Sequence, residues 1–69
     1  MEIIFNSRKV TIPEQSSLHD LIIRREVDAM WSLVFVNSRI IGHGNWKEKI
    51  LNKGDRIEVL SVNHLGEGI

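Results

Sequence analysis

Apolar residues recur with helical spacing in a single stretch of this chain, at Leu18, Leu21 and Ile22. This i, i+3, i+4 pattern predicts a short helix that buries one stripe of side chains. Ser17, three residues before Asp20, is the predicted N-cap, with the acid at the third helical position. One main helix can cover only one face of a sheet, so the remaining core residues must come from strands.

Short runs of β-prone residues lie on both sides of that helix. Residues 2–5 and 9–12 predict an opening hairpin, with residues 6–8 as its polar connector. The helix is expected to end near residues 25–27, and the apolar run at residues 33–36 predicts a strand buried in part on both faces. The other expected elements are a small strand at 40–41, a break at 42–45, one helical turn that packs Trp46, Ile50 and Leu51 on the core, a turn at 53–55 and a last strand at 56–62.

The order of these elements predicts one α+β domain, with a single main helix packed on one face of its sheet. No linker, repeat or low-complexity segment divides the chain. We assign residues 1–62 to the domain and residues 63–69 to a flexible C-terminal tail, which holds two of the five glycines.

The absence of cysteine excludes several kinds of chemistry. The chain can form no disulfide, no thiolate zinc site and no thiol nucleophile, and none of its side chains can hold a persulfide. A chain of 69 residues also buries only about 60% of the surface that its unfolded form exposes. It has little stability to spare for an enclosed active site, so we predict no catalytic residues.

Charge and hydropathy limit the expected partners. Nine basic and nine acidic residues give a formal net charge of zero, whereas nucleic-acid binding depends on a basic field. No stretch approaches the roughly 20 apolar residues of a membrane span, and the first residues lack the basic region of a secretion signal. We expect a cytoplasmic protein that binds neither nucleic acid nor membrane.

The histidines and tryptophans are predicted to have structural roles. His19, His43 and His64 lie on the expected helix, in a loop and in the tail, without a carboxylate cluster at ligand spacing, so no metal site is predicted. Trp46 is expected to pack on the core. Trp31, between the helix and the following strand, either covers the end of the core, which we favour, or anchors a partner.

Strand alternation predicts an apolar patch on the sheet face that the helix does not cover. If Ile3 and Ile57 point toward the helix, a period of two places Ile4, Leu60 and Val62 on the opposite face. A domain of this size cannot bury both faces by itself, so these three residues are candidates for docking a partner. A register shift of one residue would exchange the two sets.

Three segments of the chain resemble a known family. They are residues 15–22 at the helix start, Val36-Asn37 followed nine residues later by Trp46, and residues 54–60 before the tail. Together they resemble the ubiquitin-like sulfur carriers of the ThiS/MoaD family over nearly the whole chain. The resemblance is greater to the thiamine-biosynthesis branch than to the small subunit of molybdopterin synthase. It implies a β-grasp fold, with a mixed sheet of four to five strands.

The resemblance also implies a function. Members of this family are not enzymes but carriers whose reactive group is the C-terminal carboxylate, and they bind no cofactor. An adenylyltransferase of the ThiF type activates that carboxylate with ATP, a second enzyme supplies sulfur from a persulfide, and the resulting thiocarboxylate gives its sulfur to thiazole synthase. A carrier of this kind is a co-substrate of its adenylating enzyme and needs no cysteine of its own.

The tail departs from the family pattern at the reactive end. The family ends in two glycines, which fit a narrow channel, whereas this tail reads Gly66-Glu67-Gly68-Ile69. Three explanations are open. A protease cleaves after Gly66 or Gly68, a divergent partner accepts Ile69 directly, or the chain is a β-grasp interaction module that carries no sulfur. A carrier of the molybdopterin-synthase type is a further alternative within the same class.

Overall fold

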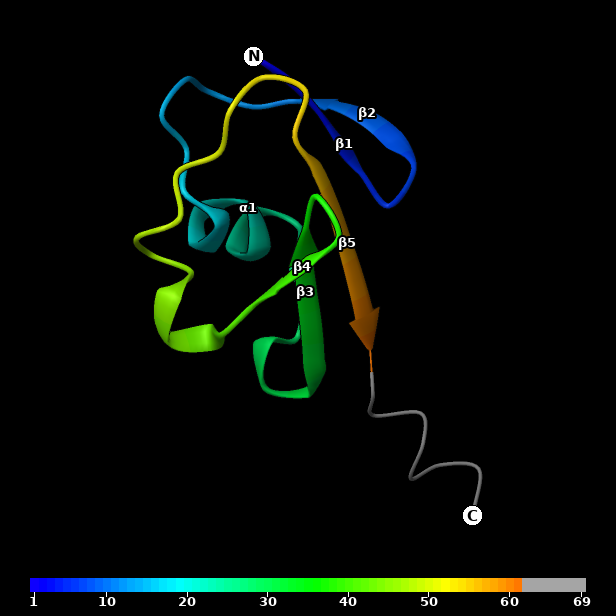
Figure 1. Cartoon of the computed structure of the whole chain (residues 1–69), viewed down its shortest axis with the longest axis vertical. Coiled ribbons are helices and arrows are strands. Elements are labelled where there is room, and N and C mark those ends of the chain that lie inside the picture. Colours follow the sequence, from blue (N-terminus) through cyan, green and yellow to red (C-terminus); the bar gives the residue numbers. More distant parts are fainter. Residues whose placement is uncertain (62–69) are drawn as a thin grey trace.

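A computed structural model describes residues 1–61 of the chain. It contains one five-stranded sheet in the order β2-β1-β5-β3-β4, with helix α1 packed on one face (Figure 1). The sheet is mixed because β1 and β5 are parallel, whereas the other neighbours are antiparallel. The predicted α+β class is therefore confirmed. The elements are β1 (Glu2–Phe5), β2 (Arg8–Thr11), α1 (Leu18–Arg24), β3 (Ser32–Val36), β4 (Arg39–Ile41) and β5 (Arg56–Ser61), with short 3₁₀ turns at Ala29–Trp31 and His43–Asn45.

Strand β5 lies at the centre of the sheet and joins its two hairpins. On one side it runs parallel to β1, with Phe5 beside Ile57. On the other side it is antiparallel to β3, from Val36 beside Ile57 to Ser32 beside Ser61. The start of β3 and the end of β5 therefore lie at the same end of the molecule, as Figure 1 shows.

Both hairpins turn through an Asn-Ser pair with positive φ at both residues. The values are 48° and 70° at Asn6 and Ser7, and 51° and 70° at Asn37 and Ser38. Positive φ at both central residues is the geometry of a type I′ turn, whose twist matches that of paired strands. The first connector has two residues rather than the predicted three, because β2 already begins at Arg8.

Helix α1 begins at the predicted residue because a capping box closes its N-terminus. The Ser17 hydroxyl accepts a hydrogen bond from the Asp20 N–H (3.1 Å), and the Asp20 carboxylate accepts one from the Ser17 N–H (3.0 Å). The backbone hydrogen bond from Ser17, helped by its hydroxyl, holds the pKa of Asp20 below its usual value. The helix has seven residues, and no helix in the described part of the chain could cross a membrane.

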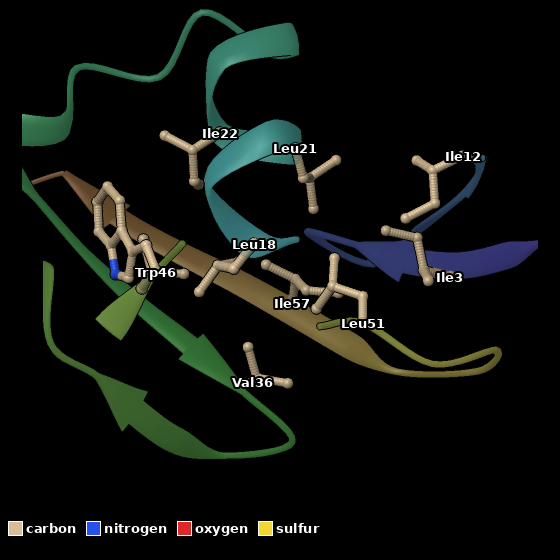
Figure 2. Packing of buried hydrophobic residues seen from close by; sticks show 10 residues of the cluster. Ile3, Ile12, Leu18, Leu21, Ile22, Val36, Trp46, Leu51 and Ile57 are labelled. Carbon is tan, nitrogen blue, oxygen red and sulfur yellow. The ribbon is translucent and has the colours of Figure 1, made fainter. Parts of the chain in front are cut away.

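The core lies between α1 and the sheet face that the helix covers. The predicted stripe of Leu18, Leu21 and Ile22 is buried there (Figure 2). Burying a side chain of this size contributes about 1.5–3 kcal/mol relative to leaving it exposed. The rest of the cluster comes from the strands, from the connection between β2 and α1 and from the long connection before β5. Its members are Ile3, Ile12, Val34, Val36, Trp46, Leu51 and Ile57.

The helical turn predicted around Trp46, Ile50 and Leu51 is confirmed in part. The 3₁₀ turn at His43–Asn45 leads into one further turn, in which the Lys49 N–H donates to the Asn45 carbonyl (3.1 Å), and Ile50 and Leu51 lie beyond it. The backbone that follows Trp46 also pairs with the start of α1. The Leu18 N–H donates to the Lys49 carbonyl (2.8 Å), and the Leu51 N–H donates to the Ser16 carbonyl (2.9 Å). Trp46 and Leu51 are nevertheless buried as expected, whereas Ile50 is exposed.

Candidate functional site: the open sheet face and the end of β5

The sheet face that α1 leaves open is largely apolar. Alternation along each strand places Leu33 and Phe35 of β3 on this face, together with Ile40 of β4 and Leu60 of β5. Leu33 is the direct neighbour of Leu60, and Phe35 is the neighbour of Ile40. The exposed fractions of Leu60 and Ile40 are 55% and 57%. We call Leu33, Phe35, Ile40 and Leu60 the open-face patch.

The structure separates two of the residues predicted to dock a partner. Ile4 and Leu60 both lie on the open face, as the alternation predicts, and Val62 lies outside the described residues. Ile4 is half-buried and in register with Arg56, four residues before Leu60 along β5. Four residues of strand span about 13 Å, so Ile4 does not belong to the patch around Leu60. Docking through these residues stays a prediction.

Three residues of the open-face patch were missed by the sequence analysis. Leu33 and Phe35 alternate with the buried Val34 and Val36, but all four form one continuous apolar run. Such a run does not tell which residues face the helix. The neighbours in β5 settle it, because Val36 pairs with the fully buried Ile57.

Apolar character on the open face increases toward the end of β5. Along this strand the outward residues are Arg56, Glu58 and then Leu60. Glu58 is the neighbour of Phe35, and Leu60 that of Leu33. The charged residues thus lie near the start of β5, and the leucine pair lies near the end from which the tail continues.

Asn6 holds β5 in place after β1 has ended. Its N–H donates to the Ile57 carbonyl, and its side-chain Oδ1 accepts from the Val59 N–H, both at 2.9 Å. The side chain therefore takes the place of the carbonyl that a longer β1 would supply. This contact fixes the strand to within two residues of Ser61.

Two segments on which the family resemblance rests meet at the opposite end of β5. The Asn37 Nδ2 donates to Asp55 Oδ1, and its Oδ1 accepts from the Arg56 N–H, both at 3.0 Å. The other Asp55 oxygen accepts from the Asn52 N–H (2.8 Å). Gly54, with φ of 83°, completes this turn. These residues hold the entry to β5 and have no arrangement suited to catalysis.

The histidines have structural contacts where the structure describes them. His43 Nε2 lies 2.9 Å from the Ser32 carbonyl, and its ring is 4.3 Å from that of Trp46. Trp46 Nε1 in turn donates to the Ile41 carbonyl (2.9 Å). Within residues 1–61, no three His, Asp or Glu side chains gather in a way that could hold a metal ion. His64 lies beyond this range.

Two shallow grooves lie at the sheet edges, and the second includes Ile40 of the open-face patch in its lining. The first, of about 270 Å³, lies between β2 and α1 and includes Arg24 and Arg25 in its lining. The second, of about 250 Å³, lies beside β4 and includes Glu48 and Lys49. Neither lining contains a nucleophile held by a base.

The remaining predicted site residues are divided between the tail and the turn after α1. Gly66, Glu67, Gly68 and Ile69 lie outside the described residues, so their role stays a prediction. Trp31 lies outside the buried cluster and is exposed. The favoured expectation that it covers the end of the core is therefore wrong.

Comparison with solved structures identifies the fold. The chain is similar to the crystal structure of the thiamine biosynthesis protein ThiS from Geobacter metallireducens, with a TM-score of 0.82. The similarity covers 88% of this chain and 93% of that one, at 20% sequence identity. At a sequence identity this low, the comparison shows only that the two chains share a fold. The fold and the open apolar face thus define a small protein of the ubiquitin-like β-grasp class.

Sequence comparison then gives the family. No curated protein matches the chain, but the model of the ThiS family matches residues 1–62. The chain belongs to the ThiS family, which confirms the resemblance found in the sequence. Members of this family are small sulfur carriers rather than enzymes, and the assignment supports the same role here.

Proposed function

We propose that this chain is a cytoplasmic sulfur carrier of thiamine biosynthesis that delivers sulfur for the thiazole ring as a C-terminal thiocarboxylate. The match of the ThiS family model over residues 1–62 is the main support. The absence of cysteine agrees with this chemistry, because the transferred sulfur is then bonded to a backbone carboxyl carbon.

The proposed reaction sequence uses three partners. An adenylyltransferase of the ThiF type joins the C-terminal carboxylate to the AMP part of ATP and releases pyrophosphate. The terminal sulfur of a persulfide enzyme displaces AMP, and a thiol cleaves the acyl disulfide to leave the thiocarboxylate. Thiazole synthase then receives the sulfur. The carrier is a co-substrate throughout and binds no cofactor itself.

The open-face patch is the proposed docking surface for these partners. A small monomer rarely exposes a contiguous group of large apolar side chains without an interaction to cover them. Leu33 and Leu60 lie next to the last residues of β5, so a partner bound there is close to the tail. Arg56 and Glu58 then supply charged residues at the rim.

Trimming of the tail is the proposed route to a reactive glycine. Cleavage after Gly68 or Gly66 would remove the bulky, β-branched Ile69 and leave a terminal residue without a side chain. A glycine terminus fits a narrow channel better than Glu67 or Ile69 does. We therefore expect the charged form of the protein to be shorter than the full sequence.

The test is ATP–pyrophosphate exchange by the cognate adenylating enzyme with a series of carriers. Chains ending at Gly68 and Gly66 are compared with a chain ending at Glu67 and with the full sequence. We expect exchange with the glycine-ended chains and little with the other two. The intact mass of protein from native cells should show the same end, with one oxygen replaced by sulfur. Absence of exchange with every chain would contradict the proposal.

A non-catalytic interaction module is the second candidate, because the tail does not end in two glycines. Deletion of residues 66–69 separates the two functions. A pure binding module keeps its partner affinity and its activity in cells after this deletion, whereas a carrier loses its activity completely. Dependence of a deletion strain on thiamine rather than on molybdenum cofactor distinguishes the proposed pathway from that of the molybdopterin-type carriers.

A further inference from the structure

The turn between α1 and β3 exposes two large apolar side chains. The exposed fraction is 76% for Met30 and 49% for Trp31, and both lie outside the buried cluster. Tryptophan is among the residues that contribute most to binding energy at protein interfaces. Two adjacent large apolar side chains in one exposed turn are a candidate contact for another protein.

Hydrogen bonds define the backbone of the turn that holds these side chains. Asp28 organises it, because its carboxylate accepts from the Met30 N–H (3.2 Å) and its carbonyl accepts from both the Trp31 N–H (3.2 Å) and the Ser32 hydroxyl (2.7 Å). His43 Nε2 lies 2.9 Å from the Ser32 carbonyl. A fixed backbone lowers the entropic cost of binding, because the side chains are presented in advance.

This turn lies at the end of the sheet from which the tail leaves. Ser32, which follows Trp31 directly, is the register neighbour of Ser61, the last described residue of β5. Gly66 and Gly68 follow Ser61 by five and seven residues, so even a fully extended chain places them within about 25 Å of it. Figure 1 shows the end of β5 and the start of β3 at the same end of the molecule, so an enzyme that holds the chain as it leaves β5 lies beside this turn.

The exposed pair also continues the open-face patch. Leu33 is two residues after Trp31 and is the register neighbour of Leu60. A partner seated on the two leucines and reaching toward the tail therefore passes the end of the sheet where Met30 and Trp31 lie. The turn therefore lies directly before the part of β3 that belongs to the proposed interface.

We propose that Met30 and Trp31 form an exit anchor, the contact through which the enzyme that adenylates the C-terminal carboxylate recognises this carrier. An apolar surface on that enzyme would cover the two side chains. This inference rests on the proposed carrier function and adds to it a residue pair that determines the partner. Trp31 acts in binding only and touches no reacting atom.

Pyrophosphate exchange with Trp31→Ala, using the glycine-ended carrier that supports exchange, tests the exit anchor. We expect the KM for the carrier to rise about tenfold or more, as for loss of an interface residue worth at least 1.4 kcal/mol. The kcat should stay within about twofold, since the anchor contributes equally to ground and transition states. Trp31→Phe should restore most of the affinity.

A matched control and an optical readout separate binding from folding. Ile50→Ala removes another exposed apolar side chain, in the connection before β5, and should leave KM unchanged. Thermal unfolding of Trp31→Ala should match that of the wild type. Trp46 is buried and Trp31 is exposed, so binding of the enzyme should shift tryptophan emission to the blue and protect it from acrylamide. Trp31→Phe should abolish that change.

The outcomes distinguish failure of the anchor from failure of the carrier function. Exchange with an unchanged KM for Trp31→Ala overturns the exit anchor and leaves the carrier function standing. Lack of exchange with every carrier overturns both. A dimer of the free carrier that Trp31→Ala dissociates also overturns the anchor, because a second copy would then be the occupant of this surface.

Discussion

The two faces of the sheet carry similar apolar side chains, but those on one face are buried and those on the other are exposed. The covered face presents Val34, Val36 and Ile57, which are all buried under α1. The open face presents Leu33 and Leu60 from the same two strands, and they remain exposed. Within residues 1–61, a single α-helix of seven residues covers one face and no second layer covers the other. Apolar composition alone therefore does not define the core of this domain; the position of the helix does.

The difference separates the side chains that stabilise the fold from those that are available for binding. Removal of a side chain from the covered face should weaken folding, whereas removal of one from the open face should leave folding almost unchanged and weaken an interaction. Each face can thus be tested separately, and the predictions below are ordered by the size of the effect.

Ile57→Ala should have the largest effect, because Ile57 is fully buried and lies between β1 and β3. The expected loss in the free energy of unfolding is about 2–5 kcal/mol, measured by urea denaturation. If this variant does not fold, Ile57→Val gives a measurable loss of about 0.5–1.5 kcal/mol. Equal losses for Ile57→Ala and Leu60→Ala would remove the distinction between the two faces.

Leu60→Ser should produce the converse result. Its cross-strand contact with Leu33 is exposed, so the free energy of unfolding should fall by less than about 1 kcal/mol. The KM for the carrier in pyrophosphate exchange should rise about tenfold. Ile50→Ser, which changes an exposed side chain outside the open-face patch, is the control and should leave KM unchanged. A Leu60→Ser carrier with the KM of the wild type would exclude this face as the docking surface.

Ser17→Ala should weaken helix α1, which covers one face of the sheet, and not the sheet itself. Loss of the hydroxyl that accepts from the Asp20 N–H should cost about 1 kcal/mol of unfolding free energy. The KM for the carrier in pyrophosphate exchange should not change, because the open face does not contact this N-cap. Thermal unfolding and pyrophosphate exchange on the same sample test both statements, and a rise in KM would show that the two faces are coupled.

The smallest expected effect is the pH dependence of the stability that this N-cap contributes. The pKa of Asp20 is lower in the folded chain than its usual value of 3.8, chiefly through the backbone hydrogen bond from Ser17. Its carboxylate therefore stabilises the fold above that value, and the contribution is lost as pH falls through the lower folded pKa. The stability difference between wild type and Asp20→Asn should be present at pH 6 and shrink toward pH 2. A difference that stays constant with pH would contradict this assignment.

The parts of the fold that local chemistry determines could be predicted from the sequence. The capping residues Ser17 and Asp20 and the spacing of the helix stripe define α1 without reference to the rest of the chain. The path of the chain just after Trp46 could not be predicted, because the backbone of Lys49 and Leu51 pairs with that of Leu18 and Ser16, some 30 residues earlier in the chain. Pairing of that kind is a property of the tertiary structure.

The candidate site shows the same division. The outward placement of Ile4 and Leu60 followed from alternation within single strands. Their separation, and the membership of Leu33, Phe35 and Ile40 in the patch, depend on which strands are neighbours and in what register. Exposure of Trp31 is likewise a property of the folded turn and not of its local sequence.

The central place of β5 has a consequence for how the protein is made. The strand that joins both hairpins follows all the other described strands in the chain, so its partners leave the ribosome before it does. Isolated hairpins are marginally stable at best. A chain whose translation stops before residue 56 lacks the strand that pairs with both β1 and β3. The complete sheet can therefore form only after β5 has been translated, because this strand joins the β1–β2 hairpin to the β3–β4 hairpin.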